Sequence, residues 1–257
     1  MRIFLSLLKK EAIEGTRTKK MTSTFILFLF IGLISPLTAK LTSMILQSIA
    51  TGNIDINVAP PSEIDSWTQF FKNISQIGMF GLAIILSTQM ANEFQKGTLI
   101  NLLSKGLPRY QVVLSKIFYN FILWFIAYFC SFILTYFYTK YFFGISFPVR
   151  NILMAALLPF IFGLFLISLE ILAGVISGNV IGTLILTTAG IVIQLILSIR
   201  DEIVKYMPIA LIGKPVNLIK GIGYDDYYVP IITGGILLII CIVISIAIIN
   251  KRQISRK

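Results

Sequence analysis

The stretch of sequence that decides the fold is residues 152–177, ILMAALLPFIFGLFLISLEILAGVIS. Glu170 is its only ionisable residue. An α-helix needs roughly 20 apolar residues to cross a hydrocarbon layer of about 30 Å, and this stretch is longer than that. It is therefore predicted to be a membrane-spanning helix.

The same criterion predicts five more spans on either side of this one. Of the 257 residues, 56% are hydrophobic and only 13% are charged. In ordinary soluble domains roughly 25% of the residues are charged. We find no internal repeat and no soluble domain. The prediction is an all-α polytopic membrane protein, a single transmembrane domain over residues 1–257, with spans at about 21–39, 74–91, 117–138, 152–177, 180–199 and 229–249.

The residue inventory excludes several kinds of chemistry. The chain has no histidine, and its two cysteines, Cys130 and Cys241, fall inside predicted spans. Gly213-Lys214 is followed by Pro215, so no phosphate-binding loop is formed. The sequence therefore predicts neither an enzyme nor a metal site, and no cofactor in this chain.

The distribution of positive charge predicts the orientation. Most of the 22 Lys and Arg residues flank the termini and the segment between the second and third spans. Because cytoplasmic loops are enriched in Lys and Arg, both termini and this segment are expected in the cytoplasm. The net charge of +11 reflects this bias, and no nucleic-acid partner is expected.

Residues 1–20 are predicted to form an interfacial helix that lies in the membrane surface. Ile3, Phe4, Leu7 and Leu8 share one face, as in such helices. Glu11 falls among these apolar residues by helical spacing. Either the amphipathic part ends before it, or Glu11 has a cationic partner.

The non-cytoplasmic loops are long and contain apolar residues. Residues 40–73 hold Trp67, Phe70 and Phe71, which are expected at the membrane–water interface. Residues 200–228 contain the apolar run 207–212, which predicts short helices that return into the outer leaflet. The fourth and fifth spans are predicted to form a tight hairpin, in which Gly174, Gly178 and Gly182 allow close approach.

Polar residues inside the spans have two readings. An intramembrane carboxylate such as Glu170 is costly, so it serves either a cationic substrate or the packing of helices. Ser, Thr and Gln can likewise line a translocation path or join helices. The candidate path residues are Gln76, Ser87, Thr88, Gln89, Glu170, Thr183, Thr187, Thr188 and Gln194.

Residues 92–110, NEFQKGTLINLLSKGLPRY, carry helix signals of their own. Thr98 can cap a helix start and Gly106 can end it. Leu99, Leu102 and Leu103 then lie on one face, which so short a helix cannot bury alone. A short helix that docks on another protein is therefore expected here.

This segment resembles the loop between the second and third spans in permeases of the type-2 ABC exporter family. The resemblance rests on Glu93-x-x-x-Gly97-Thr98, an apolar turn, Ser104, Pro108-Arg109 and Ser115-Lys116. It implies a coupling helix that docks on a separate ATPase subunit, which binds ATP and Mg, and a transporter with two permease copies, identical or paralogous. The coupling residues implied are Glu93, Lys96, Gly97, Thr98, Leu99, Leu102 and Arg109.

The cargo is less defined than the class. Small permeases of this kind resemble those that export amphipathic toxins or antimicrobial peptides, or protect against them, and Ile, Lys and Asn usage is similar to that of low-GC Gram-positive bacteria. We expect an amphipathic peptide as substrate and a bacterial cytoplasmic membrane as location. The alternatives are an ABC permease for a lipid-linked glycan, a drug or sodium, and an ATP-independent channel or secondary transporter.

Overall fold

The computed structural model describes residues 2–50, 61–95, 97 and 107–252, and it contains no β-strand in them. The α-helices are α1 (Arg2–Arg17), α2 (Lys20–Ala50), α3 (Glu63–Asn73), α4 (Met79–Gln95), α6 (Arg109–Phe143), α7 (Val149–Ser177), α8 (Val180–Leu197), α9 (Asp201–Val204), α10 (Val216–Ile219) and α11 (Tyr228–Lys251). A π-helical turn, η1 (Ile74–Gly78), joins α3 to α4, and two 3₁₀ turns are η2 (Pro208–Ile212) and η3 (Asp225–Tyr227).

Within these residues, six helices are long and apolar enough to cross a membrane. They are Lys20–Thr42, Glu63–Gln95, Arg109–Phe143, Val149–Ser177, Val180–Leu197 and Asp225–Lys251. Each corresponds to one predicted span, and the fifth ends two residues before its predicted end at 199. The prediction of an all-helical protein with six spans is confirmed. The segment predicted to form the coupling helix lies largely outside the described residues.

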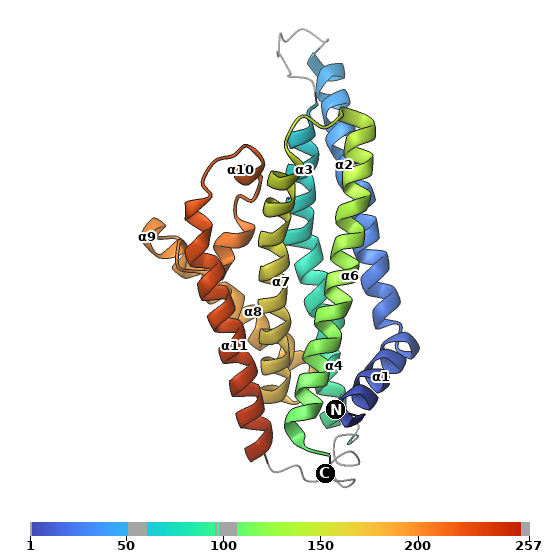
Figure 1. Cartoon of the computed structure of the whole chain (residues 1–257), viewed down its shortest axis with the longest axis vertical. Coiled ribbons are helices and arrows are strands. Elements are labelled where there is room, and N and C mark those ends of the chain that lie inside the picture. Colours follow the sequence, from blue (N-terminus) through green and yellow to red (C-terminus); the bar gives the residue numbers. More distant parts are fainter. Residues whose placement is uncertain (1, 51–60, 96, 98–106, 253–257) are drawn as a thin grey trace.

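The helices are arranged as an elongated bundle (Figure 1). α1, the last turns of α4 and α11 and the first turn of α6 lie at one end of it, the bottom of Figure 1. We call this the terminal end. α1 and the end of α11 thus lie at the same end of the bundle, next to the described residues that flank 96–106.

The second span begins earlier than predicted. α3, η1 and α4 form one continuous helical run from Glu63, and the backbone N–H of Ser62 donates to the Asp65 carboxylate over 2.9 Å at its start. This contact is one half of a capping box. The polar residues between Glu63 and Asn73 kept this first part of the helix out of the predicted span of 74–91, although the capping signal was present in the sequence.

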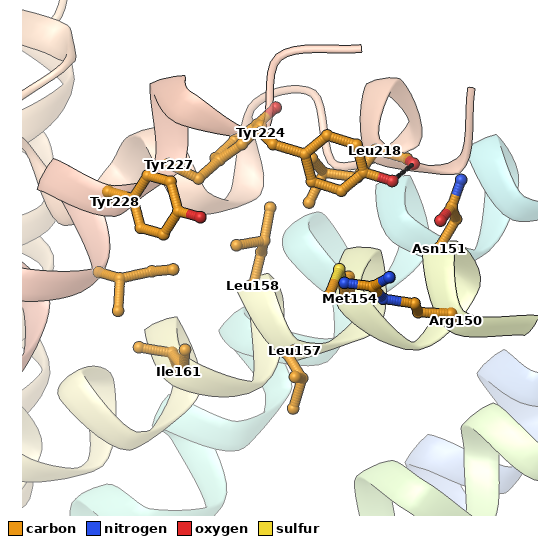
Figure 2. A pocket seen from close by; sticks show the side chains of 11 residues that line it. Arg150, Asn151, Met154, Leu157, Leu158, Ile161, Leu218, Tyr224, Tyr227 and Tyr228 are labelled. Atoms are coloured by element: carbon orange, nitrogen blue, oxygen red, sulfur yellow. Dashed lines mark hydrogen bonds between the residues drawn. The ribbon is translucent and has the colours of Figure 1, made fainter. Parts of the chain in front are cut away.

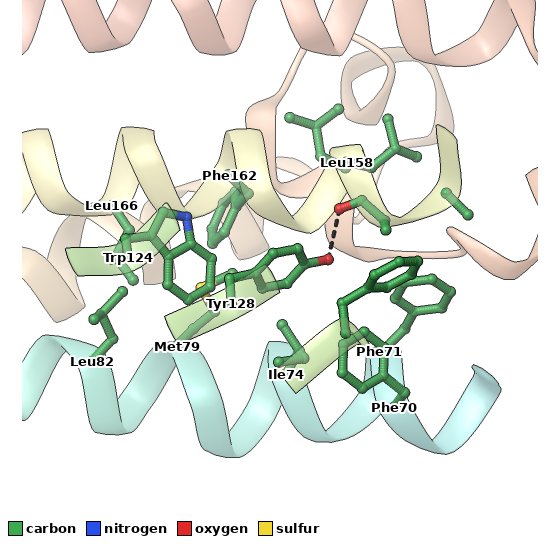
Figure 3. Close-up of a cluster of buried hydrophobic side chains, with 14 of the residues drawn as sticks. Phe70, Phe71, Ile74, Met79, Leu82, Trp124, Tyr128, Leu158, Phe162 and Leu166 are labelled. Carbon is green, nitrogen blue, oxygen red and sulfur yellow. Dashed lines mark hydrogen bonds between the residues drawn. The ribbon is translucent and has the colours of Figure 1, made fainter. Parts of the chain in front are cut away.

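The aromatic cluster at 67–71 is in the protein core, which corrects its predicted place in an interfacial loop. Trp67, Phe70 and Phe71 are buried on the face of α3 that packs against α6. Figure 3 shows Phe70 and Phe71 beside Tyr128, whose hydroxyl donates to the carbonyl oxygen of Ala156 on α7 over 2.6 Å. Aromatic packing within the chain therefore stabilises the bundle around α3.

α7 and α8 form the predicted hairpin. Gly178 ends α7 in the left-handed conformation, with φ of 68°, and the Asn179 side chain caps α8 by accepting from the backbone N–H of Gly182 over 2.7 Å. Gly174 lies close to both α4 and α8, since a Cβ on it would lie 2.8 Å from that of Met90 and 3.6 Å from Oγ1 of Thr183. The three glycines thus have different roles.

Residues 200–228 fold into the short helices α9, η2, α10 and η3. Leu211 and Ile219 are fully buried, and η2 and α10 pack against α7. The short helices were predicted. Their apolar residues are covered by the chain itself.

Candidate functional site

Five charged side chains from three helices meet at the terminal end. Lys116 of α6 places its Nζ 2.9 Å from both carboxylate oxygens of Glu11 and 3.1 Å from Oε1 of Glu93. Lys10 also contacts Glu93, and its Nζ lies 3.3 Å from Glu11 and 3.4 Å from Glu14. We call Lys10, Glu11, Glu14, Glu93 and Lys116 the basal ion cluster. It joins α1, the end of α4 and the start of α6.

The centre of this cluster is removed from water. Lys116 is 0% exposed, and Glu11 and Glu93 are each 2% exposed. Buried charges are tolerated only when they are paired, and removal of one partner leaves an uncompensated charge. Burial opposes the charged form of Lys10, but the carboxylates of Glu11, Glu93 and Glu14 raise its pKa above the usual value. Lys10 therefore remains an ammonium group through neutral pH.

The face of α1 that packs on α6 brings Glu11 to Lys116. Leu7, Glu11 and Gly15, four residues apart, are all buried on this face. Gly15 lies against the Tyr119 side chain so closely that a Cβ would collide with the hydroxyl. Phe4 packs edge-on against Phe118, with ring centroids 6.0 Å apart. Glu11 thus has the cationic partner that the sequence analysis allowed for.

The carboxylates of Glu11, Glu14 and Glu93 approach within 4.8 Å of one another, a spacing that suits a metal ion. Lys10 and Lys116 already contact these oxygens and supply the compensating charge. A further cation would be repelled by both ammonium groups, so the donor set does not fit a metal.

Two arginines close other helix ends at the terminal end. Arg109 donates to the carbonyl oxygens of Ile249, Asn250 and Arg252, over 3.0, 3.1 and 2.7 Å. Arg252 in turn donates to the carbonyl of Val175 at the end of α7 and lies over the ring of Phe94, 4.3 Å from its centroid. Arg109 thus places positive charge at the C-terminal end of α11, and Arg252 places it at the C-terminal end of α7, which are the negative ends of the two helix dipoles. The ends of α4, α6, α7 and α11 are thereby connected.

The structure describes three of the predicted coupling residues, Glu93, Gly97 and Arg109. Glu93 belongs to the basal ion cluster and Arg109 caps α11, so both face the protein. Gly97 follows the end of α4 with φ of 64°, and its N–H donates to the carbonyl of Phe94 over 3.3 Å. Only glycine adopts this conformation readily, so Gly97 ends α4. Lys96, Thr98, Leu99 and Leu102 lie outside the described residues.

Several predicted path residues make local hydrogen bonds. Ser87, Thr88 and Thr183 donate to carbonyl oxygens three or four residues earlier in the chain. Gln89 donates to Asn120 of α6 over 2.9 Å. These hydrogen bonds join or stabilise helices, as expected if the residues serve helix packing.

Glu170 differs from these residues. It is buried where α7 packs on α8, and neither carboxylate oxygen has a hydrogen-bond partner among the described residues. Its nearest polar interaction is with Thr187 on α8, whose hydroxyl also lacks a hydrogen bond of normal geometry. The side-chain oxygen of Gln194, further along α8, is unpaired as well. The carboxylate of Glu170, the hydroxyl of Thr187 and the side-chain oxygen of Gln194 therefore lack hydrogen bonds of normal geometry among the described residues.

Three of the cavities in the described part of the chain border residues 200–228. The apolar cavity, of about 270 Å³, lies between α4 and α8 and contains Gln76, Thr187 and Thr188 in its lining. The lysine cavity, of about 360 Å³, is lined by Lys72 and Lys214 and shares Ser75, Gln76 and Ile212 with the apolar cavity. The tyrosine cavity, of about 450 Å³, lies between the start of α7 and the start of α11, where Tyr224, Tyr227 and Tyr228 stand opposite Arg150 (Figure 2).

Sequence reasoning missed part of the terminal end. Neither Lys10 nor Lys116, which belongs to the Ser115-Lys116 part of the family resemblance, was predicted as the partner of Glu11 or Glu93, and Asn120 and Arg252 were not singled out. Lys116 sits between Val112, Val113 and Ile117, all buried, and this apolar setting was a usable signal. The pairing of Arg109 with the end of α11 leaves no such signal in the sequence.

The fold defines the chain as an all-helical, multi-pass membrane protein, because six of its described helices are long and apolar enough to span. The chain matches no protein-family model, no curated protein and no solved structure.

Proposed function

We propose that this chain is the membrane-spanning permease subunit of an ATP-driven exporter of the type-2 ABC kind. In this proposal it resides in a bacterial cytoplasmic membrane with the terminal end in the cytoplasm. α1 is the interfacial helix, and the segment around 98–106 is the coupling helix. A separate ATPase subunit binds ATP and Mg, since this chain has no phosphate-binding loop, and a second permease copy completes the transporter.

The basal ion cluster carries the proposal. Glu93 lies in the last turn of α4 and Lys116 lies about two turns into α6, so the cluster bridges the two helices that flank the coupling segment. Glu11 adds α1 to the same unit. A displacement of the segment by a partner would move the bases of both helices together, because a buried charged network resists separation. Such a rigid base is suited to transmit force into the membrane.

The continuity of the second span supports transmission over distance. α4 continues through η1 into α3, so motion at Glu93 reaches Gln76 along one helical run. Gln76, Thr187 and Thr188 line the apolar cavity on this route. The path itself is placed between two permease copies, with Glu170 as a buried acidic group available to a cationic cargo. The favoured cargo is an amphipathic peptide.

Co-purification from the native host tests the class. The proposal expects an ATPase of the ABC class in stoichiometric amounts, and a reconstituted complex whose ATP hydrolysis is stimulated by the cargo. Cationic amphipathic peptide, lipid-linked glycan, drug and sodium are the arms of that assay. A pure membrane protein that transports without an ATPase would establish the channel or secondary-transporter alternative instead.

A further inference from the structure

The lysine cavity is a cationic site with unused charge. Lys72 of α3 and Lys214, which follows η2, both line it, and no described carboxylate lies within ion-pair distance of either. Ser75, Gln76 and Asn217 add polar groups to the same lining. Two ammonium groups with hydrogen-bonding neighbours form a site for an anion.

The adjoining apolar cavity has the opposite character. Its walls are mainly apolar side chains of α4 and α8, including Phe80, Ile84, Ile191 and Leu195. Phe80 is 66% exposed and Leu195 is 50% exposed on the outside of spanning helices, where the bilayer is the surrounding medium. The apolar cavity is therefore accessible from the hydrocarbon layer.

The π-helical turn lies where the two cavities meet. Ile74–Gly78 interrupts the α-helical pattern between α3 and α4, and its exposed residue Gln76 lines both cavities. π-turns inside α-helices occur frequently at functional sites, because the wider turn redirects side chains. The local geometry thus serves the junction between a polar and an apolar compartment.

We propose that the paired cavities bind one anionic phospholipid of the bilayer. Its phosphate group lies in the lysine cavity with Lys72 and Lys214, and its acyl chain lies in the apolar cavity along α4 and α8. Charge complementarity selects the head group, and the opening toward the hydrocarbon layer selects a lipid over a water-soluble anion. The inference concerns this chain alone and does not depend on an ATPase partner.

The test uses the purified full chain in a neutral detergent and counts bound lipid by native mass spectrometry. Phosphatidylglycerol is expected to bind more tightly than phosphatidylcholine. The double variant K72Q/K214Q should weaken phosphatidylglycerol binding by roughly five-fold for each lysine and leave phosphatidylcholine almost unchanged. The matched control K140Q/K220Q removes two exposed lysines that line neither cavity and should change binding much less.

A further variant tests the acyl-chain half. Thr188→Phe fills part of the apolar cavity and should weaken phosphatidylglycerol, while glycerol phosphate, which lacks the chain, should bind far more weakly than the lipid to every form. Equal binding of the two lipids, equal losses in the two lysine pairs, or tight binding of glycerol phosphate would each overturn the proposal. Thermal unfolding checks the fold, and single lysine variants replace the pair if it does not fold.

Discussion

Lys116 of α6 lies 2.9 Å from both carboxylate oxygens of Glu11 in α1, with the two side chains separated by 105 positions in the chain and removed from water. Replacing Lys116 with Met would leave Lys10 as the remaining ion-pair partner of the three converging carboxylates among the described residues. Loss of one partner of a buried ion pair costs about 3–5 kcal/mol, so we expect a large drop in unfolding temperature in detergent. Lys9→Met, at an exposed position of α1, should have little effect.

The close contact of α2 with α6 gives a second prediction. A Cβ on Gly32 would lie 2.7 Å from the backbone oxygen of Ser131, and a backbone atom cannot move aside as a flexible side chain can. We expect Gly32→Ala to destabilise the protein by about 1–3 kcal/mol. Gly235→Ala is the matched control in α11, where nothing lies within 4 Å, and it should be neutral or slightly stabilising. Equal unfolding temperatures for the two variants would contradict the packing of α2 on α6.

We expect a substitution of Arg109 to loosen the C-terminal end of α11. Arg109→Gln removes a charged donor from three terminal carbonyl oxygens. Amide exchange over 246–252 should accelerate roughly ten-fold, since hydrogen bonds to charged groups contribute about 1.5–3 kcal/mol when intact. Hydrogen exchange read by mass spectrometry measures this, with the exposed Arg17→Gln as control. Unchanged exchange would mean that the contacts do not hold the helix end.

A substitution of Glu170 distinguishes a role of its carboxylate in transport from a role in helix packing. Because its carboxylate makes no hydrogen bond of normal geometry among the described residues, Glu170→Gln removes at most a weak interaction with Thr187 and should leave the unfolding temperature unchanged or higher. Export of a cationic cargo should nevertheless fall. Gln89→Leu is the contrasting variant, because it removes the 2.9 Å bond to Asn120 and should lower stability by about 1 kcal/mol. A folding defect confined to Glu170→Gln would assign this residue to packing.

The sequence was sufficient for the spans because apolar composition over 20 residues is a local property. Residues 152–177 are the clearest case, and the helix there, Val149–Ser177, begins three residues earlier and ends at the same residue. The burial of Trp67 was not predictable in this way, since it depends on how far α6 and α7 extend beside α3. The signal for that helix, Ser62 with Asp65, was present but was outweighed by the polar residues that follow.

The candidate sites depend on longer-range pairing. Glu11 stood out as a misplaced charge in an apolar face, so a partner was expected, but its identity as Lys116 follows only from α1 packing on α6. Lys72 and Lys214 are far apart in sequence and meet at one cavity through the fold of residues 200–228. Neither lysine differs from an ordinary surface residue by local pattern.

The coupling role is tested most directly by a photo-crosslinking amino acid placed at Leu102 in the native host, with mass spectrometry of the crosslinked product. We predict that an ATPase of the ABC class is crosslinked to position 102. No ATPase should be crosslinked when the photo-crosslinking amino acid replaces Lys140 instead. The product at position 102 should be lost in a Lys116→Met background, because this variant disrupts the contact between α4 and α6. Crosslinks from Leu102 to lipid alone, or to an ATPase equally from Lys140, would contradict the account.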